Sequence, residues 1–460
     1  MRKSRKFIAS VAIAAVGVAG GAVPQALAAG SSIAGGGSSF MANMMDICGA
    51  QYNRNTNYNS NGDTISYTAS GSGTGKTNFA NGTYKFGGTE SAYSSGAPSD
   101  LVYIPLIAGP IAVAYHLDGV SPSGATVRLS QSTLAKIFAG QITKWDDTAI
   151  KADNTAKTVA AVKKVTRNGV TATIVKSGTK VKVTVKATAA ALKKFKAKKL
   201  GITRINKAGT SRKALYSKTL TASTTQTFTH TTGDTYAIKA GTTSLGSVAV
   251  DADVTGVTLT LPSTPIKVAY RSGNSGTTNM FVRFLNAAVP SVWTKSANDS
   301  FTSAFPGTVP SNGTFQSASG NDGVANYVKN NNGSITYAEL SFVEERESAG
   351  VKAAAIMNNS GEYVVPTTAA ASEFFAEAAV AASGLVTLDY TVKSSTAYLI
   401  NAIAYGLSSS SASSDATAVK SFFSYFLNVC APKNASGAGY AALSGSILAK
   451  ALAQVAKIGG

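Results

Sequence analysis

The sequence predicts an α/β protein that is interrupted by one basic, β-rich segment. Short strand-like runs alternate with helical patterns over most of the 460 residues, and this alternation is typical of layered α/β folds. Between residues 152 and 263 the helical periodicity fades and residue-by-residue alternation takes its place. That segment holds 19 lysines and arginines against 4 aspartates and glutamates, a net charge of +15, whereas the whole chain carries +20. We therefore expect an α/β fold with an inserted β domain.

Residues 1–28 have the pattern of a secretory signal peptide. A cationic start (Arg2, Lys3, Arg5 and Lys6) precedes an apolar run over residues 7–23, and Ala26-Leu27-Ala28 is a small-residue cleavage site. No other run of about 18 or more apolar residues occurs, so no transmembrane helix is expected in the mature chain. We expect the mature protein to begin near Ala29, outside the cytoplasm, at the cell surface or in a periplasm. No cysteine stands at that junction, so a lipid anchor is not expected.

The two cysteines of the chain are Cys48 and Cys430. In an oxidising compartment an isolated pair favours a disulfide over a metal site, and two buried free thiols are the alternative. The two histidines, His116 and His230, have no cysteine or carboxylate at ligand spacing. A zinc site or a nucleophilic triad therefore has little support, and no cofactor is expected.

Three glycine- and serine-rich stretches have the character of turns. Residues 271–278 stand between a strand-like run and a helical run, residues 34–40 precede an apolar run, and residues 68–75 follow a short strand-like segment. The first N–H groups of a helix have no carbonyl partner, and small residues let an oxyanion approach them closely. Arg271 adds a planar guanidinium that suits phosphate or carboxylate. Each turn alone could be a flexible loop. Residues 71–77 also resemble a nucleotide-binding P-loop, but Ser70 replaces its first glycine.

Two further segments have clear local patterns. Residues 131–141 predict a helix with Leu134, Ile137 and Phe138 on one face. Residues 170–176 and 180–186 predict a β-hairpin around a Ser-Gly turn, with valines on one face and lysines on the other. The inserted segment therefore predicts a β-sandwich-like domain, of which an immunoglobulin-like arrangement is one form.

Two points about the inserted segment stay open at this level. Residues 187–200 could form a short basic helix instead of strands. Its lysines could be a plain solvated sheet face or a dedicated anion-binding surface.

Taken in order, these motifs resemble those of the substrate-binding proteins of high-affinity phosphate ABC importers. The matching stretches extend along the mature chain apart from the inserted segment, and they are residues 37–40, 71–75, 86–90, 142–147, 271–278, 323–328, 333–337 and 439–443. The resemblance implies a type II periplasmic-binding-protein fold, in which two lobes are joined by a two-crossover hinge. It also implies capture of phosphate between the lobes.

The resemblance also implies a set of ligand contacts. They fall on Ser39, Phe40, Ser72, Arg271, Ser275, Gly276 and Thr277. Glu90 stands where the family places an aspartate, whose carboxylate accepts the proton of phosphate and repels sulfate. The side chain of Glu90 is one methylene longer than that aspartate, which is one departure from the family. Gly273 is another, because the family commonly has there an aspartate that orients the arginine. A solvated surface carboxylate is the alternative for Glu90.

The implied domain bounds follow from the same resemblance. Lobe one would comprise residues 29–112 and 397–460, lobe two residues 113–151 and 264–396, and the inserted domain residues 152–263, with crossovers near Ala112 and Ala397. The expected partners are inorganic phosphate, or another tetrahedral oxyanion, and an ABC permease, and the protein is expected to be a monomer.

A rival function of a different class uses the inserted segment. A cell-surface or adhesion protein could bind anionic cell-wall polymers, lipid headgroups or nucleic acid through its many cations, with the binder fold as a scaffold. An enzyme is not expected, because no nucleophile with an adjacent base is visible in the sequence.

Overall fold

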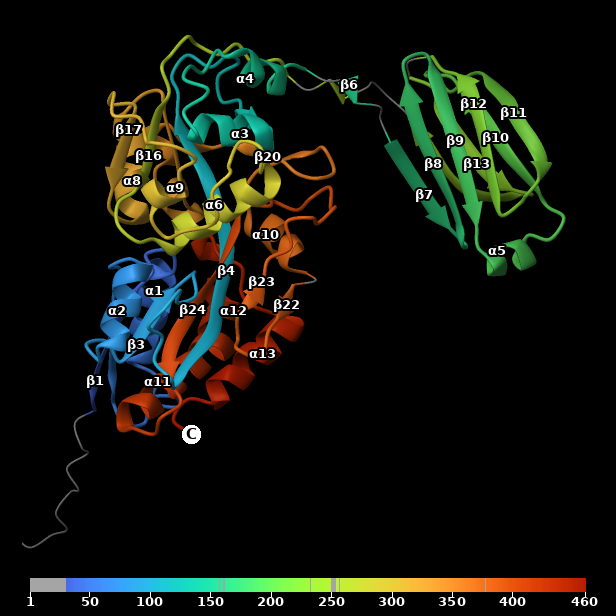
Figure 1. Ribbon diagram of the computed structural model, residues 1–460. Coiled ribbons are helices and arrows are strands. Elements are labelled where there is room, and N and C mark those ends of the chain that lie inside the picture. Colours follow the sequence, from blue (N-terminus) through green and yellow to red (C-terminus); the bar gives the residue numbers. More distant parts are fainter. Residues whose placement is uncertain are drawn as a thin grey trace, which may run out of the picture.

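The computed structural model describes residues 30–156, 158–159, 162–231, 233–249, 254–255, 257–376 and 378–460. The predicted signal peptide lies outside the described residues. Figure 1 shows a main body of two lobes and, beside it, the inserted β domain. Among the described residues, every helix is too short or too polar to cross a membrane.

A nine-stranded mixed sheet runs through both lobes in the order β17-β16-β18-β4-β24-β3-β1-β2, and β19 also pairs with β4. Its strands are β1 (Ser32–Gly37), β2 (Thr64–Thr68), β3 (Phe86–Thr89), β4 (Leu101–His116), β16 (Lys267–Arg271), β17 (Phe315–Ala318), β18 (Ser334–Glu339), β19 (Val351–Ala353) and β24 (Asn401–Ser409). Two small sheets flank it, formed by β5 (Arg128–Leu129), β20 (Ala355–Met357) and β21 (Tyr363–Val364), and by β22 (Ala379–Val380) and β23 (Val386–Thr387).

The long strand β4 connects the two lobes. Its residues 101–110 pair with β24, whereas residues 111–116 pair with β18 and β19. Nearly all of its side chains are buried. Its sequence is therefore a continuous run of apolar residues instead of an alternation of apolar and polar ones. Residues 397–400 are also buried and lead the chain back into β24. Both segments therefore run through the middle of the large sheet, where β4 pairs with strands of both lobes.

Helices pack around the large sheet (Figure 1). They are α1 (Ala42–Tyr52), α2 (Ser72–Ala80), α3 (Gln131–Phe138), α4 (Thr148–Asp153), α6 (Gly276–Ala288), α7 (Phe301–Ala304), α8 (Gly320–Asn330), α9 (Leu340–Glu344), α10 (Thr368–Phe375), α11 (Ser414–Tyr425), α12 (Ala431–Asn434) and α13 (Gly445–Ala456). The predicted helix at residues 131–141 is confirmed as α3, and its predicted apolar face is buried. It ends three residues earlier than predicted, because Gly140 adopts a positive φ of 72° just beyond it.

Cys48 of α1 and Cys430 form a disulfide, and both side chains are fully buried. The bond joins α1 to the segment that precedes α12, across a sequence separation of 382 residues. The predicted disulfide is therefore confirmed, and the free-thiol alternative is wrong.

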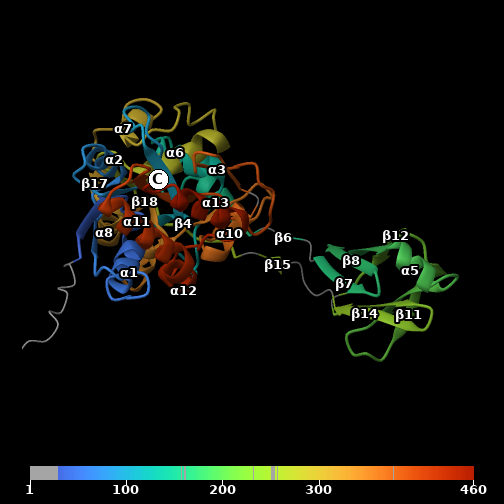
Figure 2. The same cartoon turned by 90° about the horizontal axis from the view of Figure 1, so that it is seen from below.

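The inserted domain consists of two four-stranded antiparallel sheets, β12-β9-β8-β7 and β11-β10-β13-β14. Its elements are β7 (Val162–Arg167), β8 (Val170–Ser177), β9 (Lys180–Ala187), α5 (Ala189–Lys194), β10 (Lys199–Ile205), β11 (Arg212–Thr219), β12 (Ser223–Thr229), β13 (Thr235–Ala240) and β14 (Thr243–Ala249). Side chains from both sheets form one hydrophobic core. Two short strands, β6 (Thr158–Val159) and β15 (Val254–Thr255), pair with each other between this domain and the main body (Figure 2).

The predicted hairpin is confirmed. β8 and β9 pair up to Ser177 and Lys180 at the turn. Along β9 the valines are buried and Lys180, Lys182 and Lys186 are exposed. The short basic helix is present as α5 but is shorter than residues 187–200, because Ala197 has a positive φ of 58° and β10 follows at once.

Candidate functional site

The three glycine-rich turns meet at the boundary between the lobes. β1, β2 and β3 are parallel neighbours in one lobe, and β16, β17 and β18 are parallel neighbours in the other. The loops after parallel strands gather at the carboxyl edge of a sheet, which is where such folds bind ligands. Two backbone bonds join the turns, since Gly71 N–H donates to the Gly37 carbonyl at 2.7 Å and Gly73 N–H donates to the Asn274 carbonyl at 3.1 Å.

Glu90, the residue after β3, lies in the middle of this site and is only 2% exposed. Its two carboxylate oxygens accept hydrogen bonds from the hydroxyls of Ser38 and Ser72, the second at 2.6 Å. Burial raises the pKa of the Glu90 carboxyl, while these hydroxyls and the charge of Arg271 act in the opposite direction. The alternative of a solvated surface carboxylate is therefore wrong.

Arg271 ends β16 and brings the opposite charge to the site. It is 3% exposed, and its Nη1 donates to the hydroxyl of Thr277 at 3.3 Å. Its Nε is buried without a hydrogen-bond partner among the described residues. Burial lowers the pKa of Arg271, and the nearby Tyr337 and Glu90 raise it. A buried guanidinium with an unused donor is a group that an anion would complete.

The start of α6 supplies backbone donors beside this pair. Ser275 is the N-cap, and its Oγ accepts from the Thr278 N–H at 3.2 Å. The N–H groups of Gly276 and Thr277 come before the first intrahelical bond, at the positive end of the helix dipole. A Cβ at Gly276 would lie 2.0 Å from Oε2 of Glu90. Glycine is therefore required there, because the carboxylate packs directly against the helix start.

Aromatic packing holds the α6 end of the site in place. The ring of Tyr337 stacks on Phe281 with 4.4 Å between centroids. Its hydroxyl lies 2.7 Å from the Thr278 hydroxyl and accepts from the Arg271 N–H at 3.3 Å. One buried tyrosine thereby positions both the arginine and the helix that follows it.

The first turn is held by contacts with α8 and with the C-terminal segment. Ser39 Oγ accepts from Asn321 of α8, from the backbone N–H at 3.2 Å and from Nδ2 at 3.0 Å. The ring of Phe40 is buried edge-on against Tyr440, so only its backbone faces the turn, where its N–H donates to Ser38 Oγ at 3.1 Å. The sequence reasoning missed Ser38 and Asn321. Ser38 could have been suspected, because it precedes the predicted contact Ser39 within the motif of residues 37–40.

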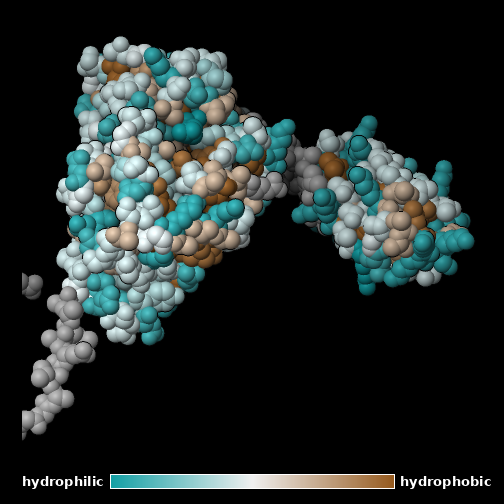
Figure 3. All heavy atoms as spheres, turned by 60° about the horizontal axis from the view of Figure 1, so that its bottom comes forward, coloured by the Kyte–Doolittle hydropathy of each residue, from teal (hydrophilic) through white to brown (hydrophobic). Residues whose placement is uncertain are grey.

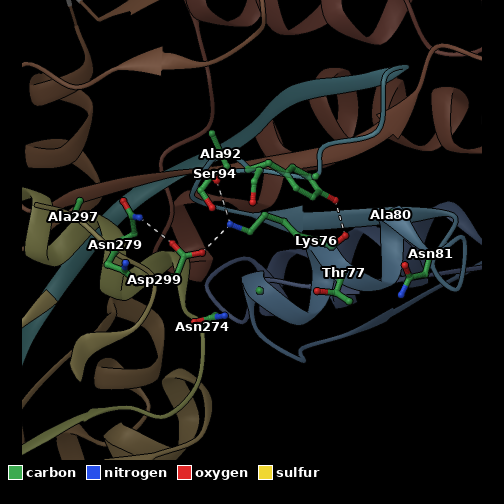
Figure 4. Close-up of a pocket in the computed structure, with 15 residues that line it drawn as sticks. Lys76, Thr77, Ala80, Asn81, Ala92, Ser94, Asn274, Asn279, Ala297 and Asp299 are labelled. Atoms are coloured by element: carbon green, nitrogen blue, oxygen red, sulfur yellow. Dashed lines mark hydrogen bonds and ion pairs between the residues drawn. The ribbon is translucent and has the colours of Figure 1, made fainter. Parts of the chain in front are cut away.

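A second set of interlobe contacts lies beside this site (Figure 4). Lys76 of α2 forms a 2.7 Å ion pair with Asp299, which also accepts from Ser91 at 3.0 Å and from Asn279 at 2.9 Å. The cavity drawn in Figure 4 is lined by Gly73, Lys76, Thr77, Ala80, Asn81, Ala92, Tyr93, Ser94, Ser95, Gly96, Asn274, Asn279, Ala297, Asn298 and Asp299. Neither Glu90 nor Arg271 lines it. It adjoins the buried charges and is not the place where they meet.

Glu339, at the end of β18, is linked to the site through Asn321, whose Oδ1 accepts from the Glu339 N–H at 3.1 Å. Burial raises the pKa of its carboxyl to about 8, against the hydrogen bonds that it accepts from Ser341. Between the ordinary pKa of a glutamate and about pH 8, this carboxyl group is ionised in the unfolded chain but stays protonated in the folded chain. Glu339 therefore makes the free energy of unfolding fall as pH rises through that window.

We expect Glu339→Gln to reduce this pH dependence. The drop in melting temperature between pH 5 and pH 8 should be smaller in the variant than in the wild type, because glutamine does not ionise. Thermal unfolding at both pH values measures it. Glu362→Gln, at an exposed position, is the matched control and should keep the wild-type drop. An unchanged drop in Glu339→Gln would contradict the assignment.

The comparisons with known proteins agree with this geometry. The chain matches the PBP superfamily domain in two stretches, residues 22–175 and 161–429. It is 25% identical over 294 residues to phosphate-binding protein PstS 3 of Mycobacterium leprae, covering 62% of this chain and 48% of that protein. It is 26% identical over 337 residues to phosphate-binding protein PstS 2 of Mycobacterium tuberculosis, covering 70% of this chain and 58% of that protein. The chain thus spans about half the length of the first of these curated relatives.

Solved structures of similar fold are also phosphate-binding proteins. One is a high-affinity periplasmic phosphate-binding protein with phosphate bound, with a TM-score of 0.56 and 17% identity, covering 92% of this chain and 93% of that one. Another is a phosphate-binding protein from Stenotrophomonas maltophilia, with a TM-score of 0.52 and 16% identity, and it also covers 92% of this chain and 93% of that one. The chain therefore belongs to the PBP superfamily, with the type II periplasmic-binding-protein fold that these solved structures share.

Proposed function

We propose that this protein captures inorganic phosphate between its lobes and delivers it to an ABC transporter, without catalysing a reaction. The observation that carries the proposal is the buried pair of Arg271 and Glu90 at the start of α6, where the arginine Nε has no partner among the described residues. A site with one cation, one proton-accepting carboxylate and free helix N–H groups suits an oxyanion that carries a proton. The names of the curated relatives support the same ligand.

The proposed donors come from all three turns. They are the guanidinium of Arg271, the backbone N–H groups of Phe40, Gly276 and Thr277, and the hydroxyls of Ser39, Ser72, Ser275 and Thr277. Such donors replace the hydration shell of a dianion without a metal. The N–H groups of Gly276 and Thr277 are already directed at the helix start, whereas the Phe40 N–H and the Ser72 hydroxyl donate to Ser38 and Glu90 and would have to turn towards the anion. Ser38 would position Ser72, because both hydroxyls bond to the carboxylate of Glu90. Asn321 would position Ser39 through a direct hydrogen bond.

Glu90 would provide the selectivity. At neutral pH phosphate keeps a proton that the carboxylate can accept, whereas sulfate has none and would meet a like charge. The contact between Glu90 and Gly276 puts this carboxylate where it would touch any anion at the helix start.

Closure of the lobes would trap the ligand. We place lobe one at residues 29–112 and 397–460 and lobe two at residues 113–151 and 264–396, with the crossovers as the hinge. The ion pair of Lys76 with Asp299 joins the two lobes and would form only when they are closed. Residues 1–28 would direct export, so that a monomeric protein would meet its permease at the outer face of the membrane.

Calorimetry of the mature protein with phosphate, arsenate and sulfate tests the proposal, and Glu90→Gln sharpens it. We expect the wild type to bind phosphate and arsenate far more tightly than sulfate, whose affinity is measured by competition against phosphate. In Glu90→Gln the preference for phosphate over sulfate should fall by about tenfold or more, since removing a buried like charge is worth at least about 1.4 kcal/mol. Glu362→Gln should leave the preference unchanged. Absence of phosphate heat in the wild type, together with no phosphate-induced shift in melting temperature, would refute the transport function.

A further inference from the structure

The positive charge of the chain is concentrated on the inserted domain. Residues 162–249 contain 18 lysines and arginines and a single acidic residue, Asp234. That carboxylate is 3% exposed and lies 3.6 Å from Nε of Arg204. In the described part of these sheets, therefore, no carboxylate faces solvent to offset the lysines. Figure 3 shows hydrophilic side chains along the outline of the inserted domain.

Several of these lysines share one sheet face. Lys180, Lys182 and Lys186 of β9 are exposed, and the β12 residues opposite them are Thr229, Thr227 and Ser223. Alternate residues on a strand lie about 7 Å apart on the same face. The face therefore presents a row of ammonium groups among hydroxyls, with no acidic residue on β7, β8, β9 or β12.

The row continues onto the end of the domain. β9 ends at Ala187, and Thr188 caps α5, which Figure 1 shows at one end of the domain. Five exposed lysines follow there within seven residues, at positions 193, 194, 196, 198 and 199. We call the three β9 lysines and these five the lysine surface.

Such a surface is costly to maintain unless a partner neutralises it, because like charges repel and lower the stability of the compact state. The main body has no such excess, since the signal peptide carries +4 and the rest of the chain outside residues 162–249 sums to −1. The charge is thus a local property of one domain and not a general feature of the chain.

The composition of the surface favours one kind of partner. Single-stranded nucleic acids are bound with aromatic side chains that stack on bases, and none of the four aromatic residues in residues 162–249, Phe195, Tyr216, Phe228 and Tyr236, is exposed. Membrane surfaces are bound with exposed apolar anchors as well as cations. Among the described residues, the large hydrophobic side chains that are exposed are Val257 and Val365, both outside the two sheets. Lysines alone, as point charges, suit a chain whose own backbone carries the anions.

We propose that the lysine surface binds a linear, phosphate-linked polyanion that carries no nucleobases, and that it thereby holds the protein on such a polymer. Binding there is electrostatic and independent of the interlobe site. It requires no unoccupied pocket, only a flexible chain that lies across β9 and around α5.

The test uses the full mature chain and long-chain inorganic polyphosphate as the probe. Affinity is measured at rising NaCl concentrations, and log affinity should fall linearly with log salt, by about 0.7 for each anion contacted. Lys180→Gln/Lys182→Gln/Lys186→Gln should weaken binding at least tenfold at ~50 mM salt and reduce the slope by about 2. The control Lys295→Gln/Lys329→Gln/Lys450→Gln removes the same charge from exposed positions of the main body and should weaken binding less than twofold.

The remaining outcomes decide against the proposal. Equal losses in both variants, or an absent salt dependence, would show that the lysine surface is not the binding face. Tighter binding to single-stranded DNA of equal charge, or to vesicles of anionic lipid, would replace the polymer with a different partner. Saturating inorganic phosphate, or Arg271→Ala, should leave polyphosphate binding unchanged. Displacement of the polymer by phosphate would overturn the independence of the two sites, whatever the fate of the transport function.

Discussion

Arg271→Ala is expected to abolish measurable phosphate binding, because the affinity for phosphate should fall by about 100-fold or more. The guanidinium is buried, is anchored on Thr277 and has one unused donor. Removing one partner of a buried, hydrogen-bonded charge pair costs about 2–5 kcal/mol. Alanine would leave the carboxylate of Glu90 as the only buried charge in the site, which would then repel the anion instead of selecting it. Calorimetry with phosphate measures the effect directly.

Two further variants separate binding from folding. Arg54→Ala removes an arginine from an exposed loop position and should bind phosphate like the wild type. Arg271→Ala/Glu90→Gln removes both buried charges, so it should melt closer to the wild type than Arg271→Ala alone and still fail to bind. Tight phosphate binding by a folded Arg271→Ala variant would show that the anion is held elsewhere.

Cys48→Ser/Cys430→Ser is expected to lower the free energy of unfolding by about 2–5 kcal/mol. The disulfide closes a loop of 382 residues, so its loss frees a large set of unfolded conformations. It also joins α1, which follows the first turn of the site, to the C-terminal segment of the chain. The variant should melt several degrees below the wild type, as measured by thermal and denaturant unfolding.

A reducing agent provides the control for the disulfide. It should lower the melting temperature of the wild type towards that of the double variant and leave the variant itself unchanged. Equal stability of the two proteins under oxidising conditions would mean that the crosslink adds nothing to the stability of the fold.

Local chemistry made several features predictable from sequence. Turns within residues 34–40, 68–75 and 271–278 were predictable because clusters of glycine and small polar residues mark turns. They are shorter than predicted, because residues 34–37 belong to β1, residues 72–75 to α2 and residues 276–278 to α6. The hairpin of β8 and β9 was predictable because alternation with a period of two leaves only one face for burial. The helix α3 was predictable from its apolar period, although its end depended on the left-handed conformation of Gly140.

Periodicity, composition and ordered motifs were enough to predict the α/β class, the inserted domain and the family of the chain. They favoured a disulfide between the two cysteines, and the fold established it. The sequence could not show that Ser38 bonds to Glu90 while Ser39 bonds to Asn321, since adjacent serines differ only in where the folded backbone directs them. The tertiary structure also decided that Ser275 caps α6 and that Glu90 packs on Gly276. Those contacts join segments far apart in the chain, and no local pattern encodes which side chains meet when two sheets close on each other.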